Sequence, residues 1–154
     1  MAKRSNTLIK SRLILIERGR VLLLRQTKRN GGNYTLLGGK VESQESARRT
    51  LVREGKEEAG IILDEADLRL AHVLHKRTGD GHRVTLYFQT HTWNGHLRSR
   101  ERDKFKSVEW CSLRQLPDNL TGTVRHVLRE VQEGRIYSEF AKKEKQPEKL
   151  KLSR

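Results

Sequence analysis

Residues 36–61 read LLGGKVESQESARRTLVREGKEEAGI, and this stretch decides how the rest of the chain is interpreted. A Gly-Gly pair is followed by a carboxylate-rich segment in which Glu54, Glu57 and Glu58 recur at helical spacing. On an α-helix, positions i, i+3 and i+4 share one face. Because like charges on adjacent turns repel, either basic neighbours such as Arg53 or a bound cation must offset them. A solvated helix laced with salt bridges therefore stands as the alternative to a cation site.

The stretch also predicts the limits and the buried face of this helix. Ser43 is a suitable N-cap and Gly60 a suitable C-terminal stop, so we expect the helix to lie between them. The apolar stripe that we expect to be buried recurs at four-residue steps and consists of Ala47, Leu51, Gly55 and Ala59, with Val52 beside it. The carboxylates then lie roughly a quarter of a turn away, at the edge of the surface on which the helix packs.

Carboxylates in this arrangement suit a hard divalent cation. Mg²⁺ and Mn²⁺ prefer clusters of carboxylate and carbonyl oxygens. Upstream, Gly38 and Gly39 let the backbone approach closely and offer a free carbonyl, and Glu45 is within reach of the same region. The chain carries 33 basic and 19 acidic residues, which gives a net charge of +14. A metal held by carboxylates on such a basic protein indicates a phosphate-bearing substrate.

At these residues the sequence resembles the Nudix hydrolases, whose pattern is G-x5-E-x7-R-E-U-x-E-E-x-G-U with U a bulky aliphatic residue. The positions that match at the required spacing are Gly39, Glu45, Arg53, Glu54, Glu57, Glu58, Gly60 and Ile61. One position departs, because Gly55 stands where the family has Leu, Ile or Val. A glycine inside a helix costs roughly 0.5–1 kcal/mol relative to alanine. It also deletes a core side chain, a loss on the order of 2 kcal/mol if the space stays empty.

The resemblance implies a fold, a reaction and a set of metal ligands. The fold is an α/β Nudix-type α/β/α sandwich with a mixed β-sheet. The reaction is hydrolysis of a phosphoanhydride in a nucleoside diphosphate linked to another group. The ligands of Mg²⁺ or Mn²⁺ would be Glu54, Glu57, Glu58 and the carbonyl of Gly38.

The resemblance also implies supporting roles around the metal ligands. Arg53 would orient the glutamates through a salt bridge, and Glu45 would assist through water or by positioning the helix. Many family members add an acid from a loop between the later strands, for which Glu101 is the first choice and Asp103 the second. A plain surface charge is the alternative for both. The catalytic candidates are therefore Glu57, Glu58, Arg53, Glu54 and Glu101.

Apolar and turn patterns predict the order of elements along the chain. Strands are expected at 8–16, 21–26, 34–37, 68–78, 82–93 and 107–113, with a second helix within 116–134. The first two strands form a hairpin, and the strand at 34–37 ends at the Gly-Gly pair. This order predicts a mixed sheet with helices packed on it, as one Nudix domain over residues 1–140. Residues 141–154 are predicted to be a basic, disordered tail.

Length and composition narrow the class of protein. A chain of 154 residues with 34% apolar and 34% charged residues predicts one soluble domain with a modest core. The excess positive charge favours polyanionic partners, although a solubilising surface is the plainer reading. Cys111 is the single cysteine, so neither an intrachain disulfide nor a cysteine-based metal site is expected. No apolar run is long enough for a membrane span, and we expect a cytoplasmic protein.

The sequence says less about the substrate. Compact members of this layout resemble MutT, which converts (oxidised) dNTPs or NTPs to a nucleoside monophosphate and pyrophosphate, and this is the first choice here. The alternatives are an RNA 5′-end pyrophosphohydrolase, favoured by the net charge, and a nucleotide- or RNA-binding protein with weak catalysis, favoured by Gly55. The substrate-binding candidates are Gly39, Lys40, Tyr34 and Asn119. Tyr87 and Phe88 alternate in direction, so one of them is expected in the core.

Overall fold

The computed structural model describes residues 6–141, and strand β1 (Asn6–Glu17) is its central element. β1 pairs antiparallel with β2 (Arg20–Gln26) and β4 (Gly38–Lys40), and parallel with β7 (Gly81–Thr90). The predicted hairpin between β1 and β2 is confirmed. Its two turn residues, Arg18 and Gly19, both have positive φ, as the tight turns of twisted hairpins require.

The main sheet runs in the order β10-β6-β7-β1-β2-β3, with β4 paired to β1 and β9 paired to β2. The parallel pairs β1·β7 and β10·β6 lie among antiparallel ones, so the sheet is mixed, as predicted. A separate two-stranded sheet joins β5 to β8. The bounds of the remaining strands are Tyr34–Thr35 for β3, Ile61–Ile62 for β5, Arg69–Arg77 for β6, Asn94–Gly95 for β8, Phe105–Ser112 for β9 and Tyr137–Ala141 for β10.

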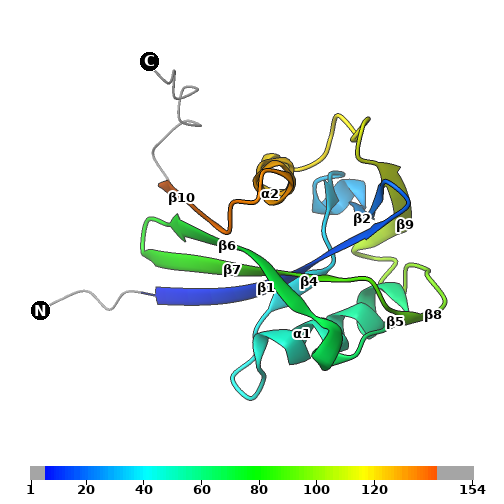
Figure 1. The fold of residues 1–154 in the computed structure, drawn as a ribbon, viewed down its shortest axis with the longest axis horizontal. Coiled ribbons are helices and arrows are strands. Elements are labelled where there is room, and N and C mark those ends of the chain that lie inside the picture. Colours follow the sequence, from blue (N-terminus) through cyan, green and yellow to red (C-terminus); the bar gives the residue numbers. More distant parts are fainter. Residues whose placement is uncertain (1–5, 142–154) are drawn as a thin grey trace, which may run out of the picture.

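Two α-helices cover opposite faces of the main sheet (Figure 1). Helix α1 (Ala47–Glu54) continues into a π-helical turn, η2 (Gly55–Ala59), and lies on one face. Helix α2 (Gly122–Gln132) lies on the other. The predicted α/β/α sandwich is therefore confirmed. Two short 3₁₀ turns, η1 (Lys28–Asn30) and η3 (Glu65–Asp67), complete the elements of the described residues.

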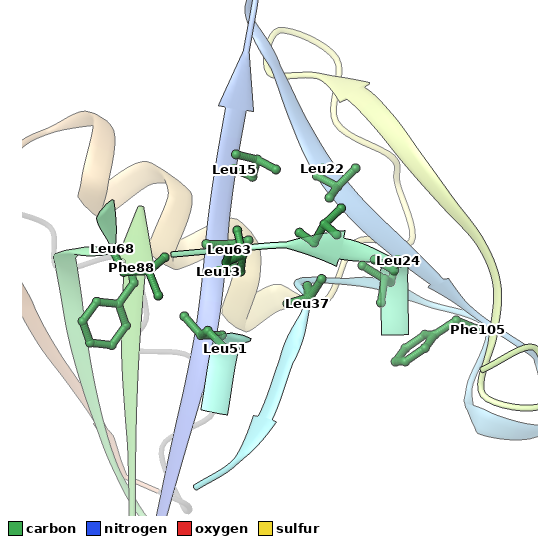
Figure 2. Packing of buried hydrophobic residues seen from close by; sticks show 12 residues of the cluster. Leu13, Leu15, Leu22, Leu24, Leu37, Leu51, Leu63, Leu68, Phe88 and Phe105 are labelled. Carbon is green, nitrogen blue, oxygen red and sulfur yellow. The ribbon is translucent and has the colours of Figure 1, made fainter. Parts of the chain in front are cut away.

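The alternation of side chains along β1 builds one core on each face of the sheet. Leu13 and Leu15 pack on the α1 side, in the cluster that Figure 2 shows, whereas Ile14 packs on the α2 side. Tyr87 and Phe88 of β7 divide in the same way, and both are buried. The sequence predicted only one of these two aromatic residues in the core; both lie there because helices cover both faces.

Several details of the predicted elements were wrong: the short strands β5 and β8 were not predicted, and β7 ends at Thr90 rather than at residue 93. Helix α1 begins after Ser46, whose side chain accepts a hydrogen bond from the backbone N–H of Arg49, so Ser43 is not the N-cap. The Gly-Gly pair lies within strand β4 rather than at the end of the preceding strand. Strand β10 was not predicted, because its pattern is short and its residues lie at the sheet edge.

Some predictions concern parts of the chain that the structure does not describe. The tail predicted for residues 141–154 lies outside the described residues beyond Ala141, so the domain boundary stays a prediction. No helix in the described part of the chain has the length and apolar character that a membrane crossing requires. The cytoplasmic location also stays a prediction.

Candidate active site

Two glycines allow strand β4 to lie against both β1 and the acidic helix. Gly38 has a φ of +141°, and a Cβ atom there would overlap the carbonyl oxygen of Ser11. A Cβ atom on Gly39 would lie 2.8 Å from the Oε1 atom of Glu54. Only glycine fits at either position without displacing a neighbour. The Gly-Gly pair therefore sets how closely the helix carboxylates approach this strand.

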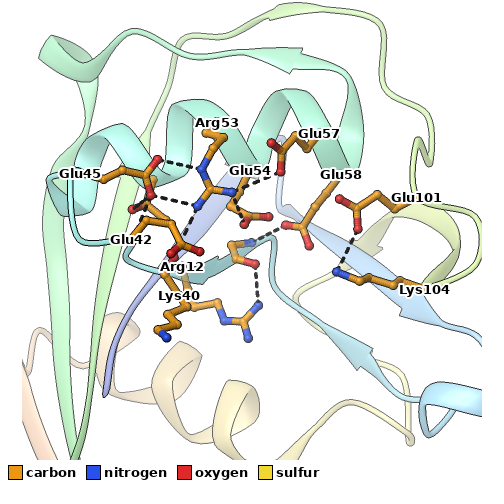
Figure 3. A network of polar contacts seen from close by, with 12 residues as sticks. Arg12, Lys40, Glu42, Glu45, Arg53, Glu54, Glu57, Glu58, Glu101 and Lys104 are labelled. Carbon is orange, nitrogen blue, oxygen red and sulfur yellow. Dashed lines mark hydrogen bonds and ion pairs between the residues drawn. The ribbon is translucent and has the colours of Figure 1, made fainter. Parts of the chain in front are cut away.

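Arg53 holds three carboxylates in place (Figure 3). Its Nε and Nη2 atoms donate to the two carboxylate oxygens of Glu45, at 2.7 and 2.9 Å. Its Nη1 atom donates to Glu54 at 2.8 Å and to Glu57 at 3.2 Å. The bidentate bond from Arg53 lowers the pKa of Glu45 to about 2. This geometry supports the orienting role predicted for Arg53.

Three carboxylates converge beside this network. Oxygen atoms of Glu54, Glu57 and Glu101 all lie within 4.8 Å of one another. Glu101 comes from the loop between β8 and β9, whose backbone is bonded to the end of η2: the N–H of Arg100 donates to the carbonyl of Glu58. Asp103 does not join the group; it is exposed, and its carbonyl accepts a hydrogen bond from Asn30. The structure thus brings the first-choice loop acid, and not the second, to the helix.

Glu58 and Gly38 lie beside the cluster and are held differently. The Glu58 side chain is buried, with 4% exposed, and accepts a hydrogen bond from the backbone N–H of Gly38 at 2.8 Å. Burial above all, and then the negative charges of Glu54 and Glu101, raise the pKa of Glu58 to about 8. The Gly38 carbonyl, a predicted ligand, accepts a hydrogen bond from Arg12 at 3.2 Å. Direct metal binding by Glu58 and Gly38 stays a prediction.

The charges and donor atoms of the site fit a hard divalent cation. Few cations offset the carboxylates: Arg53 is shared among three of them, and Lys104 pairs with Glu101 at 3.3 Å. Burial, and then the negative charges of Glu57 and Glu101, raise the pKa of Glu54 as well. Closely grouped carboxylate oxygens are the donors that Mg²⁺ and Mn²⁺ prefer. The carboxylates around the site include Glu45, Glu54, Glu57, Glu58 and Glu101.

Comparison with known proteins identifies the family of this chain. The model of the NUDIX domain matches residues 9–131. The chain belongs to the NUDIX domain family. The crystal structure of a MutT NUDIX hydrolase from Burkholderia pseudomallei superposes with a TM-score of 0.74 at 28% identity, covering 82% of this chain and 99% of that one.

Curated Nudix relatives have different names. CTP pyrophosphohydrolase of Escherichia coli is 34% identical over 102 residues, which are 64% of this chain and 71% of that protein. NAD-capped RNA hydrolase NudC of Pseudomonas aeruginosa is 32% identical over 108 residues, which are 70% of this chain. The matched part is only 37% of that relative's length.

The four residues predicted to contact substrate in this Nudix domain lie in different settings. Gly39 faces Glu54, and Lys40 is exposed on β4. Tyr34 is buried; its hydroxyl donates to Glu109 at 3.0 Å, and the guanidinium of Arg25 lies over its ring. This geometry supports a packing role for Tyr34, and stacking on a base stays a prediction.

The fourth candidate, Asn119, closes a loop. Its side-chain amide donates to the carbonyl of Gly32 at 2.9 Å, and its own carbonyl accepts from the N–H of Tyr34. Asn119 is exposed, so its side chain remains accessible to a ligand. The structure therefore shows a loop-closing role for Asn119, and recognition of a base by this residue stays a prediction.

Polar residues of three kinds, near the Nudix helix or across the sheet from it, were not predicted from the sequence. Thr50 is buried and donates to Glu45 at 3.1 Å, and Lys104 pairs with Glu101. On β1, Lys10 and Arg12 point to the α2 face together with Ile14. The signal for this last group was present, because these positions alternate with buried leucines in the same strand.

Proposed function

We propose that this Nudix protein is a divalent-cation-dependent pyrophosphohydrolase that cleaves a phosphoanhydride bond in a nucleoside triphosphate or a related nucleoside diphosphate derivative. The observation that carries the proposal is the convergence of Glu54, Glu57 and Glu101 within 4.8 Å, from a helix and a separate loop. With a nucleoside triphosphate, the products are a nucleoside monophosphate and pyrophosphate.

Each group of residues has its own part in this reaction. Glu54, Glu57 and Glu101 would hold the cation, and Arg53 fixes the first two of them against the helix. When bound, the cation supplies neutralisation of phosphate charge and makes water more acidic. Glu101 is the candidate to accept the proton of the attacking water, because among residues 6–141 its carboxylate is paired with Lys104 and not with Arg53.

The choice of a MutT-type substrate rests on size and fold. The Burkholderia pseudomallei MutT NUDIX hydrolase is covered over 99% of its length by this chain, so the whole of that protein corresponds to a domain that this chain contains. The curated relatives carry three different substrate names, including ADP-ribose pyrophosphatase in Methanocaldococcus jannaschii. These names support the reaction class and leave the nucleoside open.

The test is a panel of nucleotides assayed with Mg²⁺ and Mn²⁺, with pyrophosphate and orthophosphate detected separately. The proposal expects pyrophosphate from at least one nucleoside triphosphate and no turnover in a chelator. Glu101→Gln should lower turnover by more than tenfold, whereas Asp103→Asn, two residues away in the same loop, should not. Equal activity in wild type and Glu101→Gln would show that the loop acid takes no part in the reaction.

The second candidate function is removal of pyrophosphate from the 5′ end of RNA. Basic side chains beside strand β4 favour it, since a polymer can use cations far from the cleaved bond. Affinity for triphosphorylated RNA would then fall steeply between low and moderate salt, while turnover of mononucleotides would change little.

The third candidate, a binding protein without catalysis, loses its main support. Gly55 was its basis, and the structure places Leu63 and Ile61 against Gly55. A Cβ atom on Gly55 would lie 3.1 Å from Leu63, so the space of the missing side chain is filled. Calorimetric binding of Mg²⁺ and nucleotide without turnover would still favour this candidate.

A further inference from the structure

Three basic side chains gather on the α2 face of the sheet, away from the carboxylates. Lys76 of β6 is paired with Arg83 of β7, and Lys10 lies on the next strand, β1. Because side chains alternate along a strand, each lies on the same face as buried residues that pack under α2. Those buried neighbours are Leu74 on β6, Tyr87 on β7 and Ile14 on β1.

These cations are half-buried and lack acidic partners within the described chain. Among residues 6–141, none of the three forms an ion pair, and the Nε atom of Arg83 is buried without a hydrogen-bond partner. Burial, and then the charges of Arg12, Arg83 and Lys76, lower the pKa of Lys10 to about 8. Burial and the charge of Arg83 also lower the pKa of Lys76. Grouping unpaired cations in this way is unfavourable unless an anion binds among them.

The basic group lies across strand β4 from the Nudix glutamates. Lys10 is the direct partner of Lys40, which follows the Gly-Gly pair, and Arg12 binds the Gly38 carbonyl from the same face of β1. In Figure 3, Arg12 and Lys40 lie on the other side of β4 from Glu58 and Glu54. Neighbouring strands are about 4.8 Å apart, so the backbone of Lys10, the member of the group nearest β4, lies about one strand spacing from β4.

The start of helix α2 adds to the positive potential. The ammonium group of Lys76 donates to the hydroxyl of Thr123, in the first turn of α2, at 3.5 Å. The N-cap residue, Thr121, makes no side-chain capping bond. A helix N-terminus carries partial positive charge and favours anions. The face beside Lys76 therefore combines side-chain cations with a helix end.

We propose that Lys10, Lys76 and Arg83 form a second anion subsite, which binds a phosphate group attached to the ribose of the substrate. This orientation of the substrate rests on the proposed function, which places the anhydride to be cleaved at the glutamates. The phosphate on the ribose then lies on the other side of strand β4. A 3′-phosphate of a mononucleotide and the first phosphodiester of an RNA share the required chemistry. Guanidinium and ammonium groups recognise the oxygens of both.

A binding experiment tests the subsite without any need for turnover. Adenosine 3′,5′-bisphosphate and AMP are titrated into the protein in metal-free buffer of fixed low salt. The bisphosphate should bind wild type at least tenfold more tightly than AMP. Lys10→Gln and Arg83→Gln should each remove most of this difference, whereas Arg77→Gln, on the opposite face of β6, should keep it. Equal affinities of wild type for the two nucleotides would overturn the proposal.

Kinetics then identify the source of the phosphate. ATP, its 3′-phosphorylated form and a 5′-triphosphorylated diadenylate are compared by KM. A lower KM for both phosphate-bearing substrates supports the subsite with either source, and a lower KM for the diadenylate alone supports it with RNA. The preference over ATP should fall about tenfold in Lys10→Gln. No preference in wild type overturns the subsite. Tighter binding of the bisphosphate with no hydrolysis of any substrate would overturn the proposed function and leave the subsite standing.

Discussion

Glu58 accepts a hydrogen bond from the backbone N–H of Gly38 at 2.8 Å, and this bond ties the end of the Nudix helix to strand β4. The bond is buried and joins residues twenty positions apart. Gln at position 58 keeps an acceptor for the N–H, whereas Ala leaves it unsatisfied. We expect Glu58→Ala to lower the free energy of unfolding by about 1–3 kcal/mol more than Glu58→Gln. Urea denaturation at pH 7 measures the difference, and equal stability of the two variants would contradict the anchoring role.

Substitution of the helix carboxylates should lower activity even in variants that remain folded. Glu57→Gln and Glu58→Gln are each expected to lower Mg²⁺-dependent turnover by more than tenfold, because each replaces a carboxyl group, which can bind the cation as an anion, by a neutral amide at the metal-binding end of the helix. Glu139→Gln, an exposed change on β10, is the matched control. Full activity of both helix variants on a substrate that wild type hydrolyses would show that the metal assignment is wrong.

Arg53 should be more important to stability than an ordinary surface arginine. Arg53→Met removes the shared partner of Glu45, Glu54 and Glu57, and the metal-free protein should lose about 1–3 kcal/mol. Arg49→Met, at an exposed position of the same helix, should change little. Saturating Mg²⁺ should restore part of the loss, because a cation that binds the folded state stabilises it. Thermal unfolding with and without Mg²⁺ measures both effects, and equal losses in the two variants would argue against the network.

Position 55 should not tolerate the bulky aliphatic residue that the family normally carries there. Gly55→Leu places a side chain against Leu63 and Ile61, so we expect it to destabilise the fold by about 1–3 kcal/mol through overpacking. Leu63→Ala on its own should also destabilise, by opening a cavity. Combined, the two changes should cost less than their sum, since each relieves the other. A Gly55→Leu variant as stable as wild type, by chemical denaturation, would mean that this space is open.

The basic subsite predicts a pH dependence that can be assigned to Lys10. Its pKa of about 8 in the folded protein lies below the ordinary 10.5, so the folded state holds this proton less tightly than the unfolded chain. The cost of burying the charge is therefore fully present below pH 8 and disappears as the pH rises through about 10.5. The charges facing it come from Arg12, Lys76 and Arg83.

Lys10→Met should accordingly raise the free energy of unfolding at pH 7 relative to wild type, and this gain should shrink towards pH 10.5. Lys106→Met, at an exposed position on β9, should show no such trend. Urea denaturation across this pH range in phosphate-free buffer gives the measurement. A Lys10→Met variant less stable than wild type at pH 7 would contradict the unpaired setting of this lysine.

The sequence predicted the Nudix helix well because its signals are local. Glu54 and Glu57 share a face through helical periodicity, and Gly60 ends the helix as expected. Glu58 was assigned to the same face on the assumption of 3.6 residues per turn. The η2 segment is π-helical, and Glu58 is buried against Gly38. A glycine in the helix was visible in the sequence, but neither the change in helical type nor the contact of Gly55 with Leu63 and Ile61 was.

Long-range features were harder to predict. Glu101 and Asp103 looked alike in sequence, and the backbone bonds between their loop and η2, which bring Glu101 to the cluster, could not be foreseen from it. The basic subsite needs three strands in a particular register, and the parallel pairing of β1 with β7 cannot be read from either strand alone. The basic residues on one face of β1 were visible in the sequence, but the strands that pair with β1 were not.

The central claim is that Glu54, Glu57 and Glu101 hold one divalent cation at the start of the catalytic reaction. A crystal soaked in Mn²⁺ tests it most directly through anomalous scattering. The account predicts a peak within coordination distance of carboxylate oxygens from Glu54 and Glu57, with Glu101 beside it, and its loss in Glu57→Gln. A soaked crystal with no peak near these carboxylates, at a Mn²⁺ concentration that supports turnover, would contradict the account.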